Sequence, residues 1–112
     1  MQFQIKRDIL LKPLAVARNI IEKKNTLPIL SNVLLEIKNK KLKIVTTDLD
    51  LVFHDEISDL KVNQEGSTTT SAMVLCDLLR KLPSNLDVIF DLQSENKLNI
   101  SAENSKFNLL CL

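Results

Sequence analysis

The sequence has little glycine, few aromatic residues and only two cysteines. Its 112 residues include a single glycine, Gly66, four phenylalanines and no tryptophan or tyrosine. With one glycine there is no P-loop and no GxGxxG turn, so nothing supports nucleotide binding through backbone amides. Without aromatic bulk, a buried core has to be built from leucine, isoleucine and valine. The composition is that of one ordinary globular domain, without low-complexity sequence.

The cysteines and the apolar runs exclude several classes of protein. Cys76 and Cys111 are far apart and match no metal or redox spacing, and each lies in an apolar run typical of a buried, reduced thiol. There is no N-terminal apolar signal segment, and no apolar run reaches the roughly 18 residues that would span a bilayer. These features favour a cytoplasmic protein without a membrane partner.

Two amphipathic helices are predicted. Asp8 can cap a helix that runs to about Glu22 and contains Pro13, which should bend the axis. Ser71 can cap a second helix over about 72–82, which Pro83 stops. Each helix has one apolar stripe: Leu10, Leu14, Ala17 and Ile21 in the first, and Ala72, Leu75, Leu79 and Leu82 in the second.

Alternating apolar residues predict strands around these helices. The segments are 1–6, 31–38, 41–46, 49–60, a short STTT strand after Gly66, 86–92, 97–101 and 106–111. Asn39-Lys40 is expected to form a tight hairpin turn. The order is strand, helix and three strands, twice over, which is an internal repeat of topology. The fold class is therefore α+β, with both helices packed on antiparallel sheet and their polar faces pointing outward together.

The acidic stretch TTDLDLVFHDE, residues 46–56, surrounds the only histidine and raises the question of a metal or catalytic site. In a strand, Asp50, Val52, His54 and Glu56 would share the solvent face, and Leu51, Phe53, Asp55 and Ile57 the core face. A zinc site needs further ligands, and the sequence has no HExxH or CxxC segment to supply them. A catalytic serine would need a G-x-S-x-G segment, which is also absent. We therefore interpret the stretch as a solvated strand, with no metal and no cofactor. A small hydrolase using Asp48, Asp50 and His54 is the enzymatic alternative.

Several segments together resemble one known family. They are MQFQIKRDILLKPL, TLPILSNVLLEI, TTDLDL, GSTTTSAMVLCDLLRKLP and KFNLL. The whole chain is similar to the first domain of the bacterial DNA polymerase III beta subunit, the replicative sliding clamp. The resemblance implies a non-catalytic processivity factor of DNA replication, in which a ring of two identical chains encircles duplex DNA and tethers the polymerase. Each chain of such a ring has three similar domains, so residues 1–112 would be the first, and the second and third are absent from this sequence.

The resemblance also implies where DNA would be contacted. Helices line the hole of the ring, so cationic residues on their polar faces would meet phosphates without reading base sequence. The residues are Lys12, Lys23, Lys24 and Asn25 in or after the first helix, and Arg80 and Lys81 in the second. Lys24 stands where the family usually has arginine, which keeps the charge but loses the bidentate fork. The alternative is that these lysines form only a solvated helix face.

A second implied surface is the seam between the two chains of the ring. The second helix and the last strand would supply it, through Val74, Leu78, Phe107 and Leu109. Core packing alone is an equal explanation for these four residues. Glu103 and Ser105 occupy positions where the family commonly has basic residues, which puts the electrostatic part of the seam in doubt. Polymerase and clamp-loader subunits would dock on the domains absent here. A free-standing protein-interaction domain using the same four residues, without DNA, is the remaining alternative.

Overall fold

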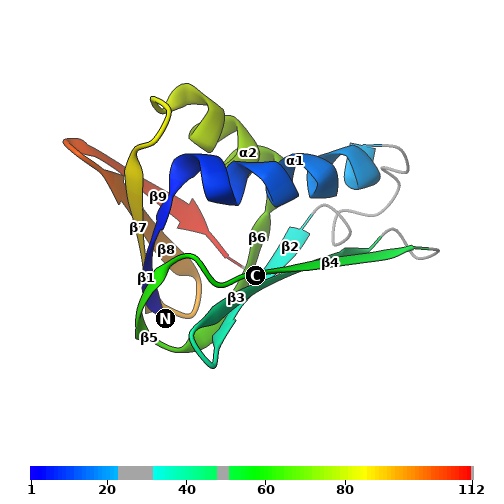
Figure 1. Cartoon of the computed structure of the whole chain (residues 1–112), viewed down its shortest axis with the longest axis horizontal. Coiled ribbons are helices and arrows are strands. Elements are labelled where there is room, and N and C mark those ends of the chain that lie inside the picture. Colours follow the sequence, from blue (N-terminus) through cyan, green and yellow to red (C-terminus); the bar gives the residue numbers. More distant parts are fainter. Residues whose placement is uncertain (23–31, 48–50, 112) are drawn as a thin grey trace.

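The computed structural model describes residues 1–22, 32–47 and 51–111 and consists of two helices laid across two antiparallel sheets (Figure 1). The helices are α1 (Arg7–Glu22) and α2 (Ala72–Lys81). The strands are β1 (Gln2–Lys6), β2 (Asn32–Lys38), β3 (Lys41–Thr47), β4 (Val52–Ile57), β5 (Lys61–Gln64), β6 (Gly66–Ser71), β7 (Asp87–Ser94), β8 (Lys97–Ala102) and β9 (Ser105–Leu110). The predicted α+β class is confirmed, and the order of strand, helix and three strands occurs twice, with one additional strand, β5, at the end of the first half.

The two halves of the repeat exchange their first strands. One sheet has the order β5-β1-β7-β8-β9 and the other β4-β3-β2-β6. Thus β1, which opens the first half, pairs with β7 of the second half, and β6, which opens the second half, pairs with β2 of the first. Each helix follows directly on the strand that its half lends to the other sheet. Neither half therefore completes a sheet by itself.

Two sequence expectations about these elements are wrong. The strand predicted over 49–60 ends at Ile57 as β4, the chain bends at residues 58–60, and a separate strand that the prediction missed, β5, joins the other sheet beside β1. The first helix begins at Arg7, immediately after β1, so Asp8 lies in the first turn and is not the capping residue before it. A carboxylate there still stabilises the helix, because it faces the positive end of the helix dipole.

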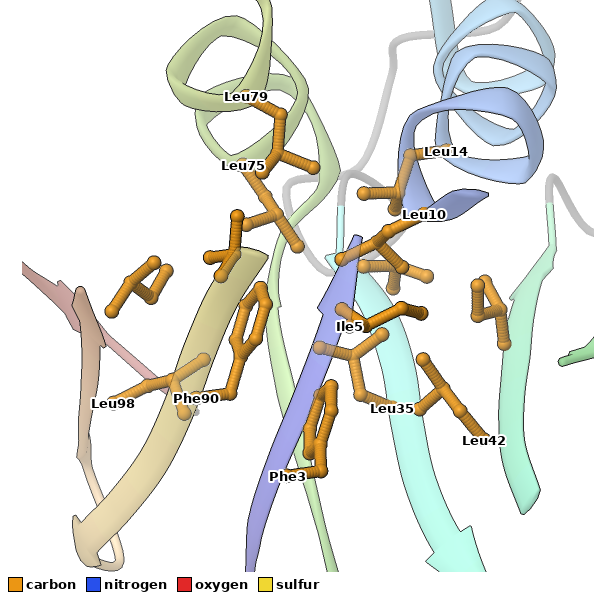
Figure 2. Close-up of a cluster of buried hydrophobic side chains, with 14 of the residues drawn as sticks. Phe3, Ile5, Leu10, Leu14, Leu35, Leu42, Leu75, Leu79, Phe90 and Leu98 are labelled. Atoms are coloured by element: carbon orange, nitrogen blue, oxygen red, sulfur yellow. The ribbon is translucent and has the colours of Figure 1, made fainter. Parts of the chain in front are cut away.

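The core lies between the helices and both sheets. Both predicted apolar stripes are buried, and Leu10, Leu14, Leu75 and Leu79 point from the helices onto the strands (Figure 2). Phe3 of β1 and Phe90 of β7 are cross-strand partners, and their rings stack with centroids 4.7 Å apart. The rest of this core is mainly aliphatic.

The ends of α2 follow the sequence prediction closely. The Ser71 hydroxyl accepts a hydrogen bond from the Val74 backbone N–H at 3.2 Å, which satisfies one of the donors that a helix start leaves open. At the other end, Leu82 is extended, with φ −86° and ψ 151°, and Pro83 follows. A residue before proline avoids helical dihedrals, so the helix stops here. Pro13 lies inside α1, as expected.

Candidate functional site

The outward surface of the helix layer gathers cationic and amide side chains. Both helices lie on the same side of the sheets (Figure 1) and bury their apolar stripes toward the strands. Lys12 and Asn19 are exposed on α1, and Arg80 and Lys81 are exposed in the last turn of α2. The other three residues predicted to contact DNA, Lys23, Lys24 and Asn25, lie outside the described residues.

Two arginines join the helices and neutralise the acids between them. The Arg7 guanidinium donates to two backbone carbonyls at the end of α2, those of Leu79, at 2.8 Å, and Arg80, at 3.3 Å. The Leu79 carbonyl also accepts a hydrogen bond from the Leu82 backbone N–H at 3.2 Å. It also pairs with Asp8 at 2.9 Å. Arg18 of α1 pairs with Asp77 of α2. The start of α1 is thereby fixed against the end of α2.

These ion pairs set the charge of the helix layer. The hydrogen bond from Arg7 holds the pKa of Asp8 below its ordinary value of 3.8, so Asp8 stays ionised and paired at neutral pH. Asp77 is matched by Arg18. Within the described part of the chain, Lys12, Arg80 and Lys81 form no ion pair. The described helix surface is therefore left with cations to offer a partner.

A second feature is an apolar groove between α2 and β9. Its volume is about 440 Å³. We call it the edge groove, and its lining residues are Val74, Asp77, Leu78, Lys81, Leu82, Ser105 and Phe107. Three of the four predicted seam residues thus meet in one place. Val74 is 49% exposed, whereas Leu78 is 8% exposed and forms the floor with the core.

The fourth predicted seam residue, Leu109, lies on β9 beyond the groove. Phe107 and Leu109 are both half-buried on one face of β9, and both pack against the core. Core packing therefore accounts for part of their apolar character. Strand β9 is the outermost strand of its sheet, so most of its outer edge has no strand neighbour among the described residues. At its end, the Leu110 carbonyl accepts a hydrogen bond from the Thr70 hydroxyl of β6, and the next residue, Cys111, forms an isolated bridge with Thr70. The groove and this open edge adjoin each other.

The sequence prediction missed some residues of this surface. Leu110 is 82% exposed at the end of β9. The alternation in KFNLL, with Phe107 and Leu109 inward, could have placed Leu110 on the outer face. Lys81 lines the edge groove as well as belonging to the basic end of α2. The helix-joining roles of Arg7 and Arg18 have no local sequence signal, because they depend on which helices meet.

The acidic stretch shows no site in the residues that the structure describes. Val52, His54 and Glu56 are exposed on β4, and Phe53 and Ile57 turn toward the core, as expected. Leu51 and Asp55, both expected on the core face, are exposed, so this expectation was wrong for the two of them; Leu51 precedes β4 and does not reach the core. Asp48 and Asp50 of the hydrolase alternative lie outside the described ranges. Across 1–22, 32–47 and 51–111, no cluster of three His, Cys, Asp or Glu side chains could hold a metal ion.

Neither helix, over the residues that the structure describes, is both long enough and apolar enough to cross a bilayer.

Comparison with known proteins gives consistent relatives. A family model described as "DNA polymerase III beta subunit, N-terminal domain" matches residues 1–112. The beta sliding clamp of Pseudomonas aeruginosa is 36% identical over 113 residues, which cover 100% of this chain and 30% of the relative. That of Caulobacter vibrioides is 37% identical over 110 residues, covering 97% of this chain and 29% of the relative.

Solved structures agree with the sequence relatives. The crystal structure of the DNA polymerase III subunit beta from Pseudomonas aeruginosa matches with a TM-score of 0.92 and 34% identity, over 100% of this chain and 30% of that one. The pol III beta structure of Caulobacter crescentus matches with a TM-score of 0.90 and 38% identity, over the same shares. This chain thus spans about 30% of the length of the proteins it matches.

Proposed function

The chain belongs to the family of DNA polymerase III beta subunits, whose N-terminal domain it matches throughout, and on this premise we propose that it serves as the first domain of a sliding clamp. In this proposal residues 1–112 are one of three similar domains in a longer chain. Two such chains close head to tail into a ring around duplex DNA and tether the replicative polymerase. The domain itself is non-catalytic and needs no cofactor.

The observation that carries the DNA-binding part is the charge of the helix surface. Asp8 and Asp77 are each paired with an arginine, whereas Lys12, Arg80 and Lys81 have no ion-pair partner in the described residues. Flexible lysines suit contacts to phosphate, which carry no sequence information. Lys23, Lys24 and Asn25, which follow α1 in the sequence, are proposed to extend the same surface.

The predicted strength of these contacts fits a sliding protein. Each phosphate neutralised contributes about 0.9 to the slope of log affinity against log salt. The few cations of one domain therefore give weak, salt-sensitive binding. In a closed ring, topology retains the DNA, so weak contacts suffice and leave the protein free to move along the duplex.

The edge groove and the open edge of β9 support the proposed seam. Val74, Leu78 and Phe107 supply an apolar centre, and charged Asp77 and Lys81 stand at its rim. This is the usual anatomy of a protein interface, with an apolar core inside a polar rim. We propose that the third domain of a second copy covers this groove and edge. Polymerase and clamp-loader subunits would dock on the other domains.

Charge reversal in the full-length protein tests the DNA-binding surface. The variants are Lys12→Glu, Arg80→Glu and the double variant Lys23→Glu with Lys24→Glu, and Lys61→Glu on the exposed strand β5 is the single-charge control. The measurement is the fraction of clamp retained on nicked circular DNA after loading, at low and moderate salt. The proposal expects lower retention for the helix variants than for the control. Equal retention in all of them would remove these residues from the DNA surface.

The hydrolase alternative is separated by a different substitution. His54 is exposed, so His54→Ala should leave the fold intact. A clamp carrying this change keeps its retention on DNA. A hydrolase would lose its activity, and loss of DNA retention in a folded His54→Ala protein would count against the clamp proposal.

A further inference from the structure

The hairpin between β2 and β3 concentrates lysines on the side of the sheets away from the helices. Lys38 ends β2, Lys40 lies in the turn, and Lys41 begins β3. In Figure 1 the tip of this hairpin lies at the lower edge of the molecule, and α1 and α2 lie at the upper edge. We call Lys38, Lys40 and Lys41 the hairpin lysines. All three are exposed, and none forms an ion pair within the described residues.

The arrangement of the hairpin lysines is unfavourable for folding. Lys38 and Lys41 are directly opposite each other in the β2–β3 register, a position where like charges repel. Lys40 has a φ of +62°, in the left-handed region where a tight hairpin turn usually has glycine. A charge cluster that opposes the local structure in two ways points to a use outside the fold.

Neighbouring charges define which lysines are available. Lys43, the next outward residue of β3, is directly opposite Glu36 on β2 and Glu56 on β4, so its charge is compensated within the sheet. Glu65 approaches the tip and accepts a hydrogen bond from the Asn39 backbone N–H at 2.8 Å. It offsets one of the positive charges of the hairpin lysines and leaves the others uncompensated.

A hollow lies beside the hairpin, on the outward face of the sheet. Its volume is about 300 Å³, and its lining residues are Glu36, Lys38, Asn39, Lys41, Lys43 and Glu56. Lys38 and Lys41 line it together at the tip end, next to the Asn39 turn. The opposite end carries the compensated Lys43 and its two glutamates. An anionic group would therefore be held at the tip end.

The absence of exposed apolar side chains from the hairpin indicates what kind of partner its lysines would bind. The large exposed apolar side chains of the described residues are Val16, Leu51, Val52, Val74, Ile89 and Leu110, and none belongs to β2, β3 or their turn. Protein interfaces are anchored by apolar, aromatic and arginine side chains and are depleted in lysine. Lysines without an apolar anchor are instead the footprint of a phosphate backbone.

We propose that the hairpin lysines form a second, sequence-independent contact for the phosphate backbone of nucleic acid, on the outside of the domain. Lys38 and Lys41 hold the phosphates, and Lys40 extends the contact around the turn. This surface is separate from the helix surface, which lies on the other side of the sheet that carries the hairpin. It would bind nucleic acid that the ring does not enclose.

The proposal is tested with the full-length protein and two labelled probes, a short oligo(dT) and a short duplex, followed by fluorescence anisotropy against salt. The hairpin variant is Lys38→Glu with Lys41→Glu. The control is Lys61→Glu with Lys97→Glu, which changes the charge equally at exposed positions elsewhere. Removing two single-strand phosphate contacts should lower the salt slope by about 1.4, or shrink the affinity change between about 50 and 200 mM salt about sevenfold. The duplex arm shows which form of nucleic acid the hairpin prefers.

Several outcomes would overturn the inference. One is a hairpin variant that binds both probes as the control does. Another is a hairpin variant that loses only the binding of a glutamate-rich peptide, which would assign the tip to a protein partner. Lys38→Gln with Lys41→Gln, checked for folding by circular dichroism, separates lost contacts from new repulsion: it must show the same direction of change. Lys12→Glu with Arg80→Glu is measured in parallel, so a failure of the helix surface is seen independently of the hairpin.

Discussion

Arg18 of α1 forms an ion pair with Asp77 of α2, which lies 59 positions further along the chain. The Arg18 side chain is 16% exposed and the Asp77 side chain 49% exposed, so the pair is partly screened by solvent. Together with Arg7 at the end of α2, it fixes the relative position of the two helices. The cationic surface that we propose for DNA is built on this pair of helices.

The Arg18–Asp77 pair is expected to contribute modestly to stability. We predict that Asp77→Asn and Arg18→Gln each lower the free energy of unfolding, with a coupling of about 0.5–1 kcal/mol in a double-mutant cycle, because half-exposed pairs are weakened by solvent. Urea denaturation of the four proteins measures it. A coupling of zero would mean that this ion pair does not help to hold the helices together, and that the apolar stripes and the hydrogen bonds of Arg7 do so.

Asp8 should make stability depend on pH in the acid range. Because its folded pKa lies below its ordinary value of 3.8, the ionised form is favoured in the folded state. Its contribution is therefore complete above the ordinary pKa and is lost as the pH falls through the lowered one. The urea midpoint of Asp8→Asn, followed from neutral to strongly acid pH, should decline less steeply below about pH 4 than that of the unchanged protein. Parallel curves would contradict the Arg7–Asp8 interaction.

The edge groove should control assembly of the full-length protein. We predict that Val74→Glu weakens the dimer about tenfold or more, since it places an unpaired charge in an apolar centre and each 1.4 kcal/mol is a factor of ten. Val74 is half-exposed, so the domain should remain folded. Sedimentation velocity over a concentration series measures the change. Ile89→Glu, which alters another exposed apolar residue away from the groove, is the control and should leave the dimer intact.

A substitution in the turn of the β2–β3 hairpin should increase the stability of the domain. Lys40→Gly is predicted to raise the free energy of unfolding by about 1 kcal/mol, because it removes the cost of a left-handed side chain. Lys41→Gly, in the strand beside it, should lower stability by about 0.5–1 kcal/mol instead, because glycine weakens a strand. Thermal unfolding of the two variants decides the point: a loss of stability in both would show that the Lys40 side chain stabilises the fold.

Gly66, the only glycine, is predicted to be required because Met1 packs too close to it to leave room for a side chain. Gly66 has a φ of +155°, and a Cβ there would lie 2.9 Å from the Cβ of Met1, which is buried. Met1 is also held by its carbonyl, which accepts a hydrogen bond from the Leu92 backbone N–H at 2.9 Å. Gly66→Ala should therefore destabilise the domain by about 1–3 kcal/mol. Ser67→Ala, the exposed neighbour on β6, should change stability by no more than about 0.5 kcal/mol; equal effects would contradict the close contact.

The sequence predicted the features that depend on neighbouring residues. The stripes of α1 and α2 follow the 3.6-residue period, the Ser71 cap follows from its hydroxyl, and the Asn39-Lys40 turn follows from its place between two alternating segments. The bend at residues 58–60 was missed because it has no proline or glycine, and β5 was missed because its four residues, Lys61–Gln64, include a single apolar residue, Val62. The pairing of β1 with β7 could not be predicted from spacing, since it joins segments from different halves.

Part of the candidate site was predicted from the sequence, and part of it required the structure. Exposed cations on the helices were identified from the polar faces, and Val74, Leu78 and Phe107 meet in one groove as the seam hypothesis requires. The neutralising roles of Arg7 and Arg18 needed the structure, because a long side chain can reach several neighbours and only the packing of the helices selects one. The hairpin lysines can be seen in the sequence, but the sequence alone does not show that Lys38 and Lys41 are directly opposite each other in the β2–β3 register.

The exchange of first strands has a consequence for the order in which the protein forms. Residues 2–6 pair with residues 61–64 on one side and with residues 87–94 on the other, so most of the domain has to leave the ribosome before both neighbours of the first strand are available. Contacts so distant along the chain are slow to close, because the intervening loop loses much entropy. The sheet that contains β1 is therefore expected to be completed only after β7 has been synthesised.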